Sequence, residues 1–463
     1  MKAFIQHQLY TRPRLARIAQ KLYHSIPAKL RVAKDFLDWL AFFRESESWS
    51  VAEHRHYQLE RLNAVCSKFS ARNPAFRERF GGEGGVSWRS LEDYSARVPA
   101  MTKDEFETNM KSSYPADIKS SMYKLSGTSG TTGRALQFYH RSADWHREFA
   151  AICHQWARVG FDALRSRRVE FRGLTVSRGG IDYYPKNGMV RCNILDFSPD
   201  AVRRYGEVIA AEGLKFYHGY PSALTLLAST IMQRGLKFPQ PSAVLLASEM
   251  AYDWQLELLE EVFPKARLYA HYGCAERAVL AGWCEQRREY HVLPTYAYVE
   301  TNPGSGEVIG TNLFNDVNPF LRYRMTDVAL GVDNEPCPDC GRNFVPRFAA
   351  IGGRSEDYLF SPEHGWIPPA IVTYPLKRIH NIREIQVVQD RKDAIEVRYT
   401  VHEGAQEAGV AAEMEEVRGK FLEMMGRSMA ITFSRVSEFE RGATGKFKWI
   451  VSDIDGPIGA RCT

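Results

Sequence analysis

The chain has 463 residues, of which 44% are hydrophobic, 25% charged and 12% aromatic. This composition is typical of a globular protein and excludes wholesale disorder, collagen and a long coiled coil. The formal net charge of +6 arises from 61 basic and 55 acidic residues, and this weak positive charge suits a small anionic ligand. The basic residues are scattered and do not alternate with aromatic ones in the pattern that binds nucleic acid.

Residues 1–80 are predicted to be helical, because Leu, Phe, Trp and Tyr recur at helical spacing among charged residues. The chain lacks an apolar stretch of about 18 residues and a signal-peptide pattern at its start, so we expect a cytoplasmic protein. The apolar run Phe36–Phe43 could rest on an anionic membrane surface or a partner, but we favour a helical layer packed on the main domain. The basic residues upstream of this run are Arg12, Arg14, Arg17, Lys21, Lys29 and Arg31.

A glycine-rich segment at 81–86 ends this region, and short apolar runs then alternate with amphipathic ones up to about residue 352. In chain order, the predicted elements are a strand at Lys215–His218, a helix from Pro221 to about Gly235, a strand at Ala243–Ala247, a helix marked by Trp254, Leu258 and Val262, and a strand at Arg267–His271. This order predicts parallel α/β layers, in which ligands bind at the carboxyl ends of the strands.

Residues 353–463 have a different pattern. A strand with alternating apolar residues at 395–401 precedes a helix whose apolar stripe covers 414–424, and a further strand follows at 431–433. This arrangement predicts a small α+β domain with a boundary near Gly352–Gly353. The expected fold class is therefore α/β, with a large multi-layer N-terminal domain (81–352), a helical N-terminal extension and a small C-terminal domain.

The segment Leu125–Arg134, with the sequence LSGTSGTTGR, gives the sharpest local signal. Its glycines permit a tight backbone whose N–H groups can turn toward an anion, and its hydroxyls and Arg134 add donors that suit a triphosphate. It is not a GxxxxGK[ST] P-loop. The alternative is a flexible linker, which we disfavour because a linker would be more monotonous and would separate two domains. The predicted phosphate-binding residues are Ser126, Thr128, Ser129, Gly130, Thr131, Thr132 and Gly133.

This loop resembles the phosphate loop of the adenylate-forming superfamily, which contains acyl-CoA synthetases, luciferases and peptide-synthetase adenylation domains. Four further segments resemble the superfamily's motifs in the same order: His271–Glu276, Thr311–Asp327, Ile351–Asp357 and Gly442–Phe447. Together the motifs span about two thirds of the chain. The segments 88–106 and 311–327 are also similar to the phenylacetate–CoA ligase-like family, which includes relatives associated with capsular polysaccharide biosynthesis.

The resemblance implies a role for each matched residue. Forming an acyl adenylate joins two anions, so the site must neutralise charge while it aligns the reacting groups. Glu276 would help to hold Mg²⁺, Asp327 would accept hydrogen bonds from the ribose, and Tyr272 could stack on adenine. Arg354 would support the nucleotide, and Lys446 would reach the α-phosphate and the carboxylate. Taken singly, each could be an ordinary surface or turn residue; their shared order favours the functional interpretation.

The superfamily's small domain rotates between adenylation and thiolation, so the resemblance implies a mobile C-terminal domain with its pivot at Glu356 or Asp357. The adjacent Gly352–Gly353 would supply backbone freedom. Two positions depart from the family pattern, namely Arg134 after TTG and Thr326 where Gly commonly precedes Asp. Arg322 and Arg324 are expected to share one strand face, where they either stabilise the sheet or approach the nucleotide.

A second candidate constellation consists of Cys284, His291, Cys337 and Cys340. The last two form a CxxC pair, and Cys₃His is a standard tetrahedral zinc set. Four protein ligands leave no open position, so the pattern predicts a structural zinc knuckle within 284–340, similar to one in some phenylacetate–CoA ligase-like relatives. The alternatives are a redox CxxC or free thiols, and a disulfide framework is not expected in a long chain without a signal.

The sequence therefore predicts an ATP-dependent carboxylic acid ligase that uses Mg²⁺ and passes the acyl group to coenzyme A, an amine or a hydroxyl. Its acid pocket is expected from residues 138–139, 171–173, 217–221 and 248–250. The alternative, from a different functional class, is a non-catalytic nucleotide-binding scaffold in polysaccharide biosynthesis. We expect no nucleic-acid partner, and a homodimer stays open.

Overall fold

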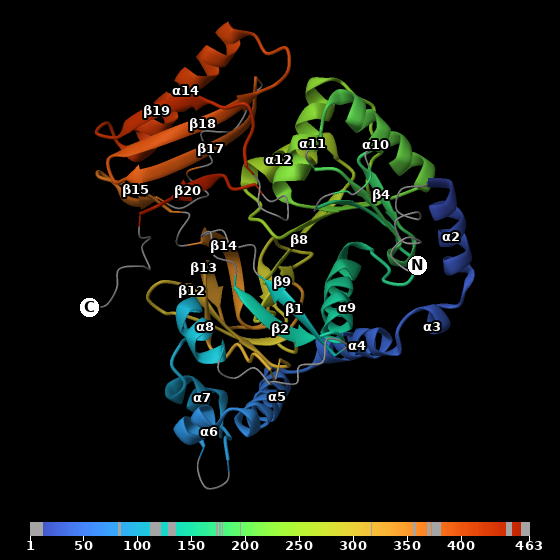
Figure 1. Ribbon diagram of the computed structural model, residues 1–463, viewed down its shortest axis with the longest axis vertical. Helices are drawn as coiled ribbons and strands as arrows, with labels where there is room; N and C mark the ends of the chain where they lie inside the picture. Colours follow the sequence, from blue (N-terminus) through green and yellow to red (C-terminus); the bar gives the residue numbers. More distant parts are fainter. Residues whose placement is uncertain are drawn as a thin grey trace.

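The computed structural model describes residues 13–81, 85–111, 122–127, 136–172, 175, 177, 179–194, 196–315, 317–354, 358–367, 372, 381–440 and 447–454. Figure 1 shows a large body that contains the N-terminal helices and a central sheet, with a smaller unit (orange and red) at the upper left. Within the described ranges, no helix is both long and apolar enough to cross a bilayer.

The N-terminal region is helical, as the sequence predicts, and forms the blue edge of the molecule in Figure 1. Helix α5 begins at a capping box between Ser50 and Glu53, and α6 begins where the Asn73 side chain accepts a backbone N–H. The helices are α2 (Pro13–Ser25), α3 (Ala28–Arg31), α4 (Lys34–Glu45), α5 (Val51–Arg72), α6 (Pro74–Phe80), α7 (Leu91–Arg97) and α8 (Lys103–Lys111).

Helix α4 carries the apolar run of 36–43 and buries it. Phe36, Leu40 and Phe43 are at most 5% exposed and belong to the large hydrophobic core. The ring of Phe36 lies 5.8 Å from that of Phe149 on helix α9 (Asp144–Trp156). Burial of three such side chains stabilises the contact by several kcal/mol, on the order of 1.5–3 kcal/mol each. This run therefore packs on the large body, as we favoured from the sequence.

A mixed sheet of twelve strands runs through the described part of the large body, in the order β11-β12-β13-β14-β10-β9-β8-β7-β6-β3-β5-β4. Strands β5, β3, β6, β7 and β8 are parallel neighbours, and the other neighbouring pairs are antiparallel. The strands are β3 (Arg168–Phe171), β4 (Ile181–Tyr184), β5 (Met189–Cys192), β6 (Phe216–Gly219), β7 (Ala243–Ala247), β8 (Arg267–Gly273), β9 (Leu280–Trp283), β10 (Tyr290–Val292), β11 (Ala297–Thr301), β12 (Glu307–Asn312), β13 (Tyr323–Asp333) and β14 (Arg347–Arg354).

The parallel segment confirms the strand–helix alternation predicted from the sequence. Helix α10 (Pro199–Glu212) precedes β6, α11 (Pro221–Gln233) connects β6 to β7, and α12 (Asp253–Val262) connects β7 to β8. Strand β7 is buried along its whole length, which explains why its sequence is a continuous apolar run and does not alternate. Strand β8 extends two residues beyond the predicted end, so Tyr272 and Gly273 lie on the strand itself.

The C-terminal unit has its own sheet and its own core. Strands β17 (Ile382–Arg391) and β18 (Ala394–Val401) form an antiparallel hairpin, and β19 (Ala430–Arg435) and β20 (Ile450–Ser452) join it in parallel on either side. The apolar stripe of helix α14 (Glu407–Met425) belongs to the same buried cluster as residues of β17 and β18. Two short strands, β15 (Leu359–Ser361) and β16 (Gly365–Ile367), form a separate pair. The predicted α/β fold class with a small C-terminal α+β domain is confirmed.

One expectation about the large sheet is wrong. Arg322 does not share a strand with Arg324, because it precedes β13 and has a positive φ of 46°. Its guanidinium pairs with Glu300 and donates to the backbone carbonyls of Ser95 and Val98. Arg324 pairs with the buried Glu307 at 2.8 Å. Both arginines therefore bind groups of the large body and help to hold the sheet and the helix α7 region together.

Candidate active site

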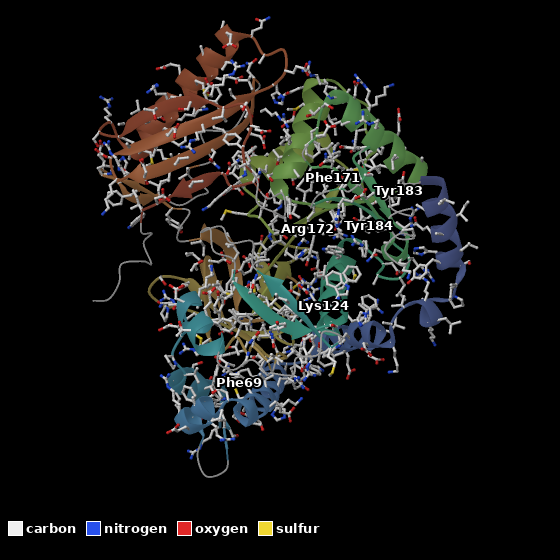
Figure 2. The ribbon with its side chains drawn as sticks, in the orientation of Figure 1. Phe69, Lys124, Phe171, Arg172, Tyr183 and Tyr184 are labelled. Carbon is white, nitrogen blue, oxygen red and sulfur yellow. The ribbon has the colours of Figure 1, made fainter. Side chains whose placement is uncertain are left out.

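The candidate site lies where neighbouring parallel strands end. Strands β6, β7 and β8 are adjacent and parallel, so their carboxyl ends meet at one edge of the sheet, where open α/β sheets bind ligands. A Cβ at Gly219, the last residue of β6, would lie 2.6 Å from the carbonyl oxygen of Phe171, so only glycine fits. Figure 2 labels Phe171 and Arg172 at the end of β3, and the Arg172 guanidinium lies 5.9 Å from the ring of Tyr220.

Unusual backbone conformations are found beside the candidate residues. Of the four described non-glycine residues with positive φ, Ser248, Arg277 and Thr326 directly neighbour Glu249, Glu276 and Asp327 in sequence. Such conformations cost about 1–3 kcal/mol each and collect at functional sites. Thr326 has a φ of 60°, which gives a physical reason why glycine is common at this position in the family it resembles.

Tyr272 and Asp327 meet across the sheet. The Tyr272 hydroxyl donates to Oδ2 of Asp327 at 2.6 Å, and both side chains are half-buried. Asp327 on β13 is in register with Arg354 on β14, whose side chain lies outside the described residues. A tyrosine hydroxyl bound to the aspartate fixes the orientation of the carboxylate.

Glu276 is 6% exposed and follows the end of β8. Its backbone carbonyl accepts from Nδ2 of Asn312, and the next residue, Arg277, pairs with Glu148 on helix α9 at 2.7 Å. These contacts fix the backbone of the motif on both sides of Glu276, so its carboxylate is held on a rigid support.

Strands β1 (Tyr123–Gly127) and β2 (Gln137–Arg141) form an antiparallel pair in which Gly127 is opposite Gln137. Ser126 therefore lies at the end of a strand, while the predicted phosphate-binding residues Thr128, Ser129, Gly130, Thr131, Thr132 and Gly133 lie outside the described residues. The hairpin is tied to the segment 312–318 by Tyr139, whose N–H donates to Asn318 at 2.6 Å and whose carbonyl accepts from Asn315 at 2.8 Å.

Asn312, Asn315 and Asn318 were not singled out in the sequence, although their NxxNxxN spacing is visible there. Each is at most 2% exposed. The side-chain oxygens of Asn312 and Asn315 each accept two backbone N–H groups of the following turn, so the segment is held by its own amides. This buried ladder connects the β1–β2 hairpin to the strand that carries Asp327.

The C-terminal domain contacts the same edge of the large sheet through Glu249, which follows β7. Oε2 of Glu249 accepts from the backbone N–H of Ser222 in the first turn of α11, and Oε1 accepts from the backbone N–H of Phe447 at 3.4 Å. Beside it, the rings of Trp254 and Trp449 lie 5.3 Å apart in an edge-to-face arrangement. Lys446 precedes Phe447 in sequence and, like Glu356 and Asp357, lies outside the described residues.

A cavity of about 360 Å³ separates the two domains next to this contact. Its lining comes from α11, α12, the beginning of β17 and the 447–449 segment. Trp254 and Leu258, the first two residues of the stripe predicted for α12, line this cavity, whereas Gln255, Leu256 and Leu259 pack into the interior. The apolar stripe therefore correctly predicts the helix, but it lies on the face that is turned toward the C-terminal domain.

A buried polar cluster lies at the ends of β3, β6 and β8. Glu170 accepts from the Arg191 guanidinium at 2.6 Å and lies 3.3 Å from Nδ1 of His218. Burial lowers the pKa of His218 to about 4 and that of His271 to about 3. Nδ1 of His271 accepts from the Trp156 indole, so His271 is a neutral buried side chain and part of the wall beneath the strand ends.

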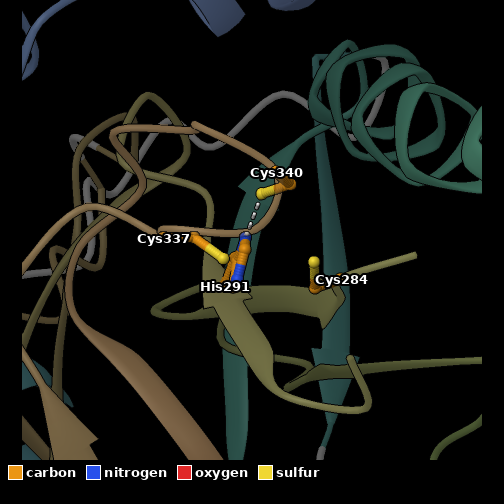
Figure 3. Close-up of side chains that lie close together, drawn as sticks. All are labelled: Cys284, His291, Cys337 and Cys340. Atoms are coloured by element: carbon orange, nitrogen blue, oxygen red, sulfur yellow. Dashed lines mark hydrogen bonds between the residues drawn. The ribbon is translucent and has the colours of Figure 1, made fainter. Parts of the chain in front are cut away.

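Four side chains lie close together, as Figure 3 shows: Cys284 directly after β9, His291 on β10, and Cys337 and Cys340 in the loop between β13 and β14. Their ligand atoms all lie within 4.8 Å of one another, and Sγ of Cys340 is 3.8 Å from Nδ1 of His291. Tetrahedral zinc with bonds of about 2.3 Å to sulfur places ligand atoms about 3.8 Å apart. A small contraction of the cluster would therefore bring its ligand atoms to the spacing that zinc requires. Nε2 of His291 is buried and makes no hydrogen bond.

The backbone around these four residues has the form of two knuckles. The N–H of Cys284 donates to the carbonyl of Glu289, and the N–H of Cys337 donates to the carbonyl of Arg342. Arg342 also binds Glu285 through two hydrogen bonds and pairs with Glu47 of the N-terminal region. The donor set and its support fit a closed tetrahedral metal site.

The chain is similar to known proteins by family model, by sequence and by fold. Residues 359–453 match the model of the CapK C-terminal domain. The protein CapK of Staphylococcus aureus is 22% identical over 440 residues, covering 87% of this chain and 93% of that protein. A crystal structure of 2-hydroxyisobutyryl-CoA ligase in the postadenylation state has a TM-score of 0.67 at 19% identity, covering 89% of this chain and 92% of the other. The same ligase in its thioesterification state, with equal coverage and 20% identity, has a TM-score of 0.56.

The C-terminal part of the chain matches the CapK family model, most of the chain is similar to CapK, and its fold is that of 2-hydroxyisobutyryl-CoA ligase. The resemblance drawn from five short motifs is thereby confirmed. Of the superfamily motif residues, the described ones are Ser126, Tyr272, Glu276 and Asp327 together with the backbone of Arg354. Tyr272, Asp327 and the backbone of Arg354 are brought together directly.

Proposed function

We propose that this chain is a member of the adenylate-forming superfamily and acts as an ATP-dependent carboxylic acid ligase. It joins an acid to AMP with release of pyrophosphate and then transfers the acyl group to an acceptor. Coenzyme A is the first candidate acceptor, and an amine or a hydroxyl is the second. The 2-hydroxyisobutyryl-CoA ligase structures, crystallised with acyl-AMP and with CoA, support this choice by fold.

The observation that carries the proposal is the contact between Phe447 and Glu249. It attaches the segment that follows Lys446 to the carboxyl end of β7, beside the strand that carries Tyr272. An ammonium group delivered from the C-terminal domain to this edge could neutralise the charge that develops when a carboxylate approaches the α-phosphate. The higher TM-score with the postadenylation state than with the thioesterification state supports a conformation on the adenylation side.

In the proposed reaction, a carboxylate oxygen of the acid attacks the α-phosphorus of ATP, and the bond from that phosphorus to the bridging oxygen breaks as pyrophosphate leaves. Tyr272 would pack against adenine and orient Asp327, whose carboxylate would accept hydrogen bonds from the ribose. Glu276 would hold Mg²⁺ through its carboxylate, and the loop at 126–133 with Arg354 would hold the nucleotide. In the second step, the acceptor attacks the acyl carbon and AMP leaves.

The C-terminal domain rotates between these two steps in the proposal, with its pivot at Glu356 or Asp357. The large body and the C-terminal domain have separate cores, which supports such a movement. Among the described residues, hydrogen bonds between the two bodies include Phe447 to Glu249 and Arg234 to the carbonyl of Glu403. We further propose that Cys284, His291, Cys337 and Cys340 hold a structural Zn²⁺, which cross-links two knuckles and takes no part in the chemistry.

The test is ATP–pyrophosphate exchange with the full chain across a panel of short hydroxylated, aryl and long-chain carboxylic acids. We expect exchange with one class of acid, and we expect Lys446→Ala to lower it by about 100- to 1000-fold without a change in thermal stability. Lys420→Ala is the matched control, because Lys420 is a surface residue of α14 that pairs with Glu416. Unchanged exchange in Lys446→Ala would remove Lys446 from its role.

The same assay separates the ligase from the non-catalytic scaffold. Binding of Mg-ATP without pyrophosphate exchange for every class of acid would favour the scaffold. The motif departures at Arg134 and Thr326 are the observations that motivated this alternative, and the geometry of Thr326 weakens it, because the threonine adopts the positive φ that glycine would supply.

A further inference from the structure

The first 34 residues differ in charge from the rest of the chain. They contain eight basic residues and no acidic residue, whereas the remaining 53 basic residues are balanced by 55 acidic ones. The positive net charge of the protein therefore comes from its N-terminal end. A segment of this charge is attracted to anionic surfaces, and the attraction weakens as salt increases.

Helix α2, which lies in this segment, is amphipathic but buries its less apolar side. Ala16 and Gln20 are 0% and 6% exposed, and Oε1 of Gln20 accepts from the Arg167 guanidinium at 2.9 Å. Leu15, Ile18 and Leu22 share another face of the helix and are 44%, 56% and 64% exposed. A helix that only covers a core has the reverse arrangement, as α4 does.

The exposed apolar face continues beyond α2. Ile26 and Leu30 are 41% and 79% exposed, and Lys29 between them is exposed as well. Five of the eleven large hydrophobic side chains exposed in the described part of the chain therefore lie within residues 15–30. We call the face formed by Leu15, Ile18, Leu22, Ile26 and Leu30 the apolar stripe.

Helices α2 and α3 lie at the right edge of the molecule in Figure 1, and the C-terminal domain lies at the upper left. The stripe is thus accessible to a large flat surface, and a surface bound there leaves the C-terminal domain free to move. Helix α2 is attached to the rest of the large body by the hydrogen bond between Gln20 and Arg167, and the Tyr23 hydroxyl ties α2 to α3 by donating to the carbonyl of Arg31 at 2.8 Å.

We propose that the apolar stripe docks on the surface of a lipid bilayer that contains anionic lipids. An apolar face exposed on a basic segment is the pattern of helices that lie in the plane of the interface, with apolar side chains among the acyl chains and cations near the head groups. A second copy of the chain fits poorly, because a symmetric contact would bring two segments with eight basic residues each against one another. This surface is separate from the proposed ligase site and does not depend on it.

The test is co-sedimentation of the full chain with vesicles of phosphatidylcholine alone and of phosphatidylcholine mixed with phosphatidylglycerol. We expect binding to the mixed vesicles that is at least about tenfold tighter than to the neutral ones and that weakens with added NaCl. The triple variant Leu15→Gln, Ile18→Gln, Leu22→Gln should lose at least about tenfold in affinity, because Gln preserves the helix but removes the apolar contact.

The matched control is the double variant Leu330→Gln, Val332→Thr, which removes two exposed apolar side chains from strand β13 (41% and 36% exposed). It should bind the mixed vesicles as the unmodified chain does, and thermal unfolding should show that both variants are folded. Equal binding to neutral and anionic vesicles, binding to neither, or unchanged binding of the triple variant would each overturn the proposal. So would an oligomer, seen by light scattering, that the triple variant dissociates.

Discussion

The Cys/His cluster and the candidate nucleotide site differ in the number of domains that contribute residues to them. All four residues of the cluster come from the large body: one directly follows β9, one lies on β10, and two lie in the loop between β13 and β14. The nucleotide site joins the strand ends of the large body to a segment of the C-terminal domain through a few contacts around Glu249. A site within one core can serve stability, whereas a site shared by two cores can be opened and closed, as a two-step transfer requires.

Loss of the cluster should therefore have the largest effect, and the effect should be on stability. Removing a ligand, as in Cys337→Ser, should release one equivalent of metal per chain and lower the free energy of unfolding by several kcal/mol, because metal binding contributes directly to folding. Elemental analysis and chemical denaturation measure the two effects. Cys274→Ser is the control, since Cys274 lies outside the cluster. A fully folded, metal-free Cys337→Ser protein with unchanged stability would show that the cluster is only a set of thiols.

Acid should destabilise the large body first. Burial lowers the pKa of His54 and His154 to about 4 and that of His271 to about 3, whereas the unfolded chain protonates near 6.5. Because the folded pKa values are lower, the stability that depends on neutral imidazoles is fully present above pH 6.5 and is lost as the pH falls toward 4. The expected loss is about 1–3 kcal/mol per histidine, measured by denaturation at stepwise pH.

The histidine contribution can be tested directly by His271→Asn, which should flatten the dependence of stability on pH between 6.5 and 4. Within the described C-terminal domain, only His402 has a pKa lowered in this way, to about 4, through burial. The near-UV signal of the large body should therefore change at higher pH than that of the C-terminal domain. Simultaneous loss of both signals at every pH would contradict this difference.

Asp327→Asn should weaken nucleotide binding without loss of stability. Removing the carboxylate charge affects each hydrogen bond that the ribose would donate, so we expect the KM for ATP in the exchange assay to rise by about 10- to 100-fold. Tyr272→Phe, which removes only the 2.6 Å hydrogen bond to Asp327, should have a smaller effect. Asp333→Asn is the matched control on the same strand, because Asp333 lies six residues beyond Asp327, at the far end of β13, and pairs with Arg347. A similar rise in Asp333→Asn would point to a general effect on β13.

Glu249→Gln should have the smallest effect and should act on the contact between the domains. Its carboxylate accepts hydrogen bonds from the backbone N–H groups of both Ser222 and Phe447. Loss of the charge should shift the equilibrium constant between the closed and open arrangements of the two domains about three- to tenfold toward the open one. The paired Trp254 and Trp449 rings give a direct fluorescence readout of this contact. Glu260→Gln, on the exposed part of α12 and outside the lining of the interdomain cavity, is the control. Unchanged fluorescence together with reduced exchange would mean that Glu249 acts on the substrate and not on the domain contact.

Much of the fold could be predicted from local patterns. Alternating short apolar runs and amphipathic runs gave β6, α11, β7, α12 and β8 with nearly correct ends, because helix and strand periodicity and the breakers Gly219 and Pro221 act over a few residues. The long-range pairs could not be predicted in this way. The contacts of Tyr139 with Asn315 and Asn318, the Arg342 contacts with Glu47 and Glu285, and the Glu249 bridge join residues far apart in sequence, and no spacing rule connects them.

The sequence by itself determined the types of residue that can do the chemistry and their order: a glycine-rich hydroxyl loop, the carboxylates of Glu276 and Asp327, a late lysine, and a Cys₃His set. It also determined the excess of positive charge at the N-terminal end. Only the tertiary structure decided which side of an amphipathic helix is covered, so that α4 is buried and the stripe of α2 is exposed. The physical reason is that periodicity specifies a face, whereas burial depends on what the rest of the chain packs against it.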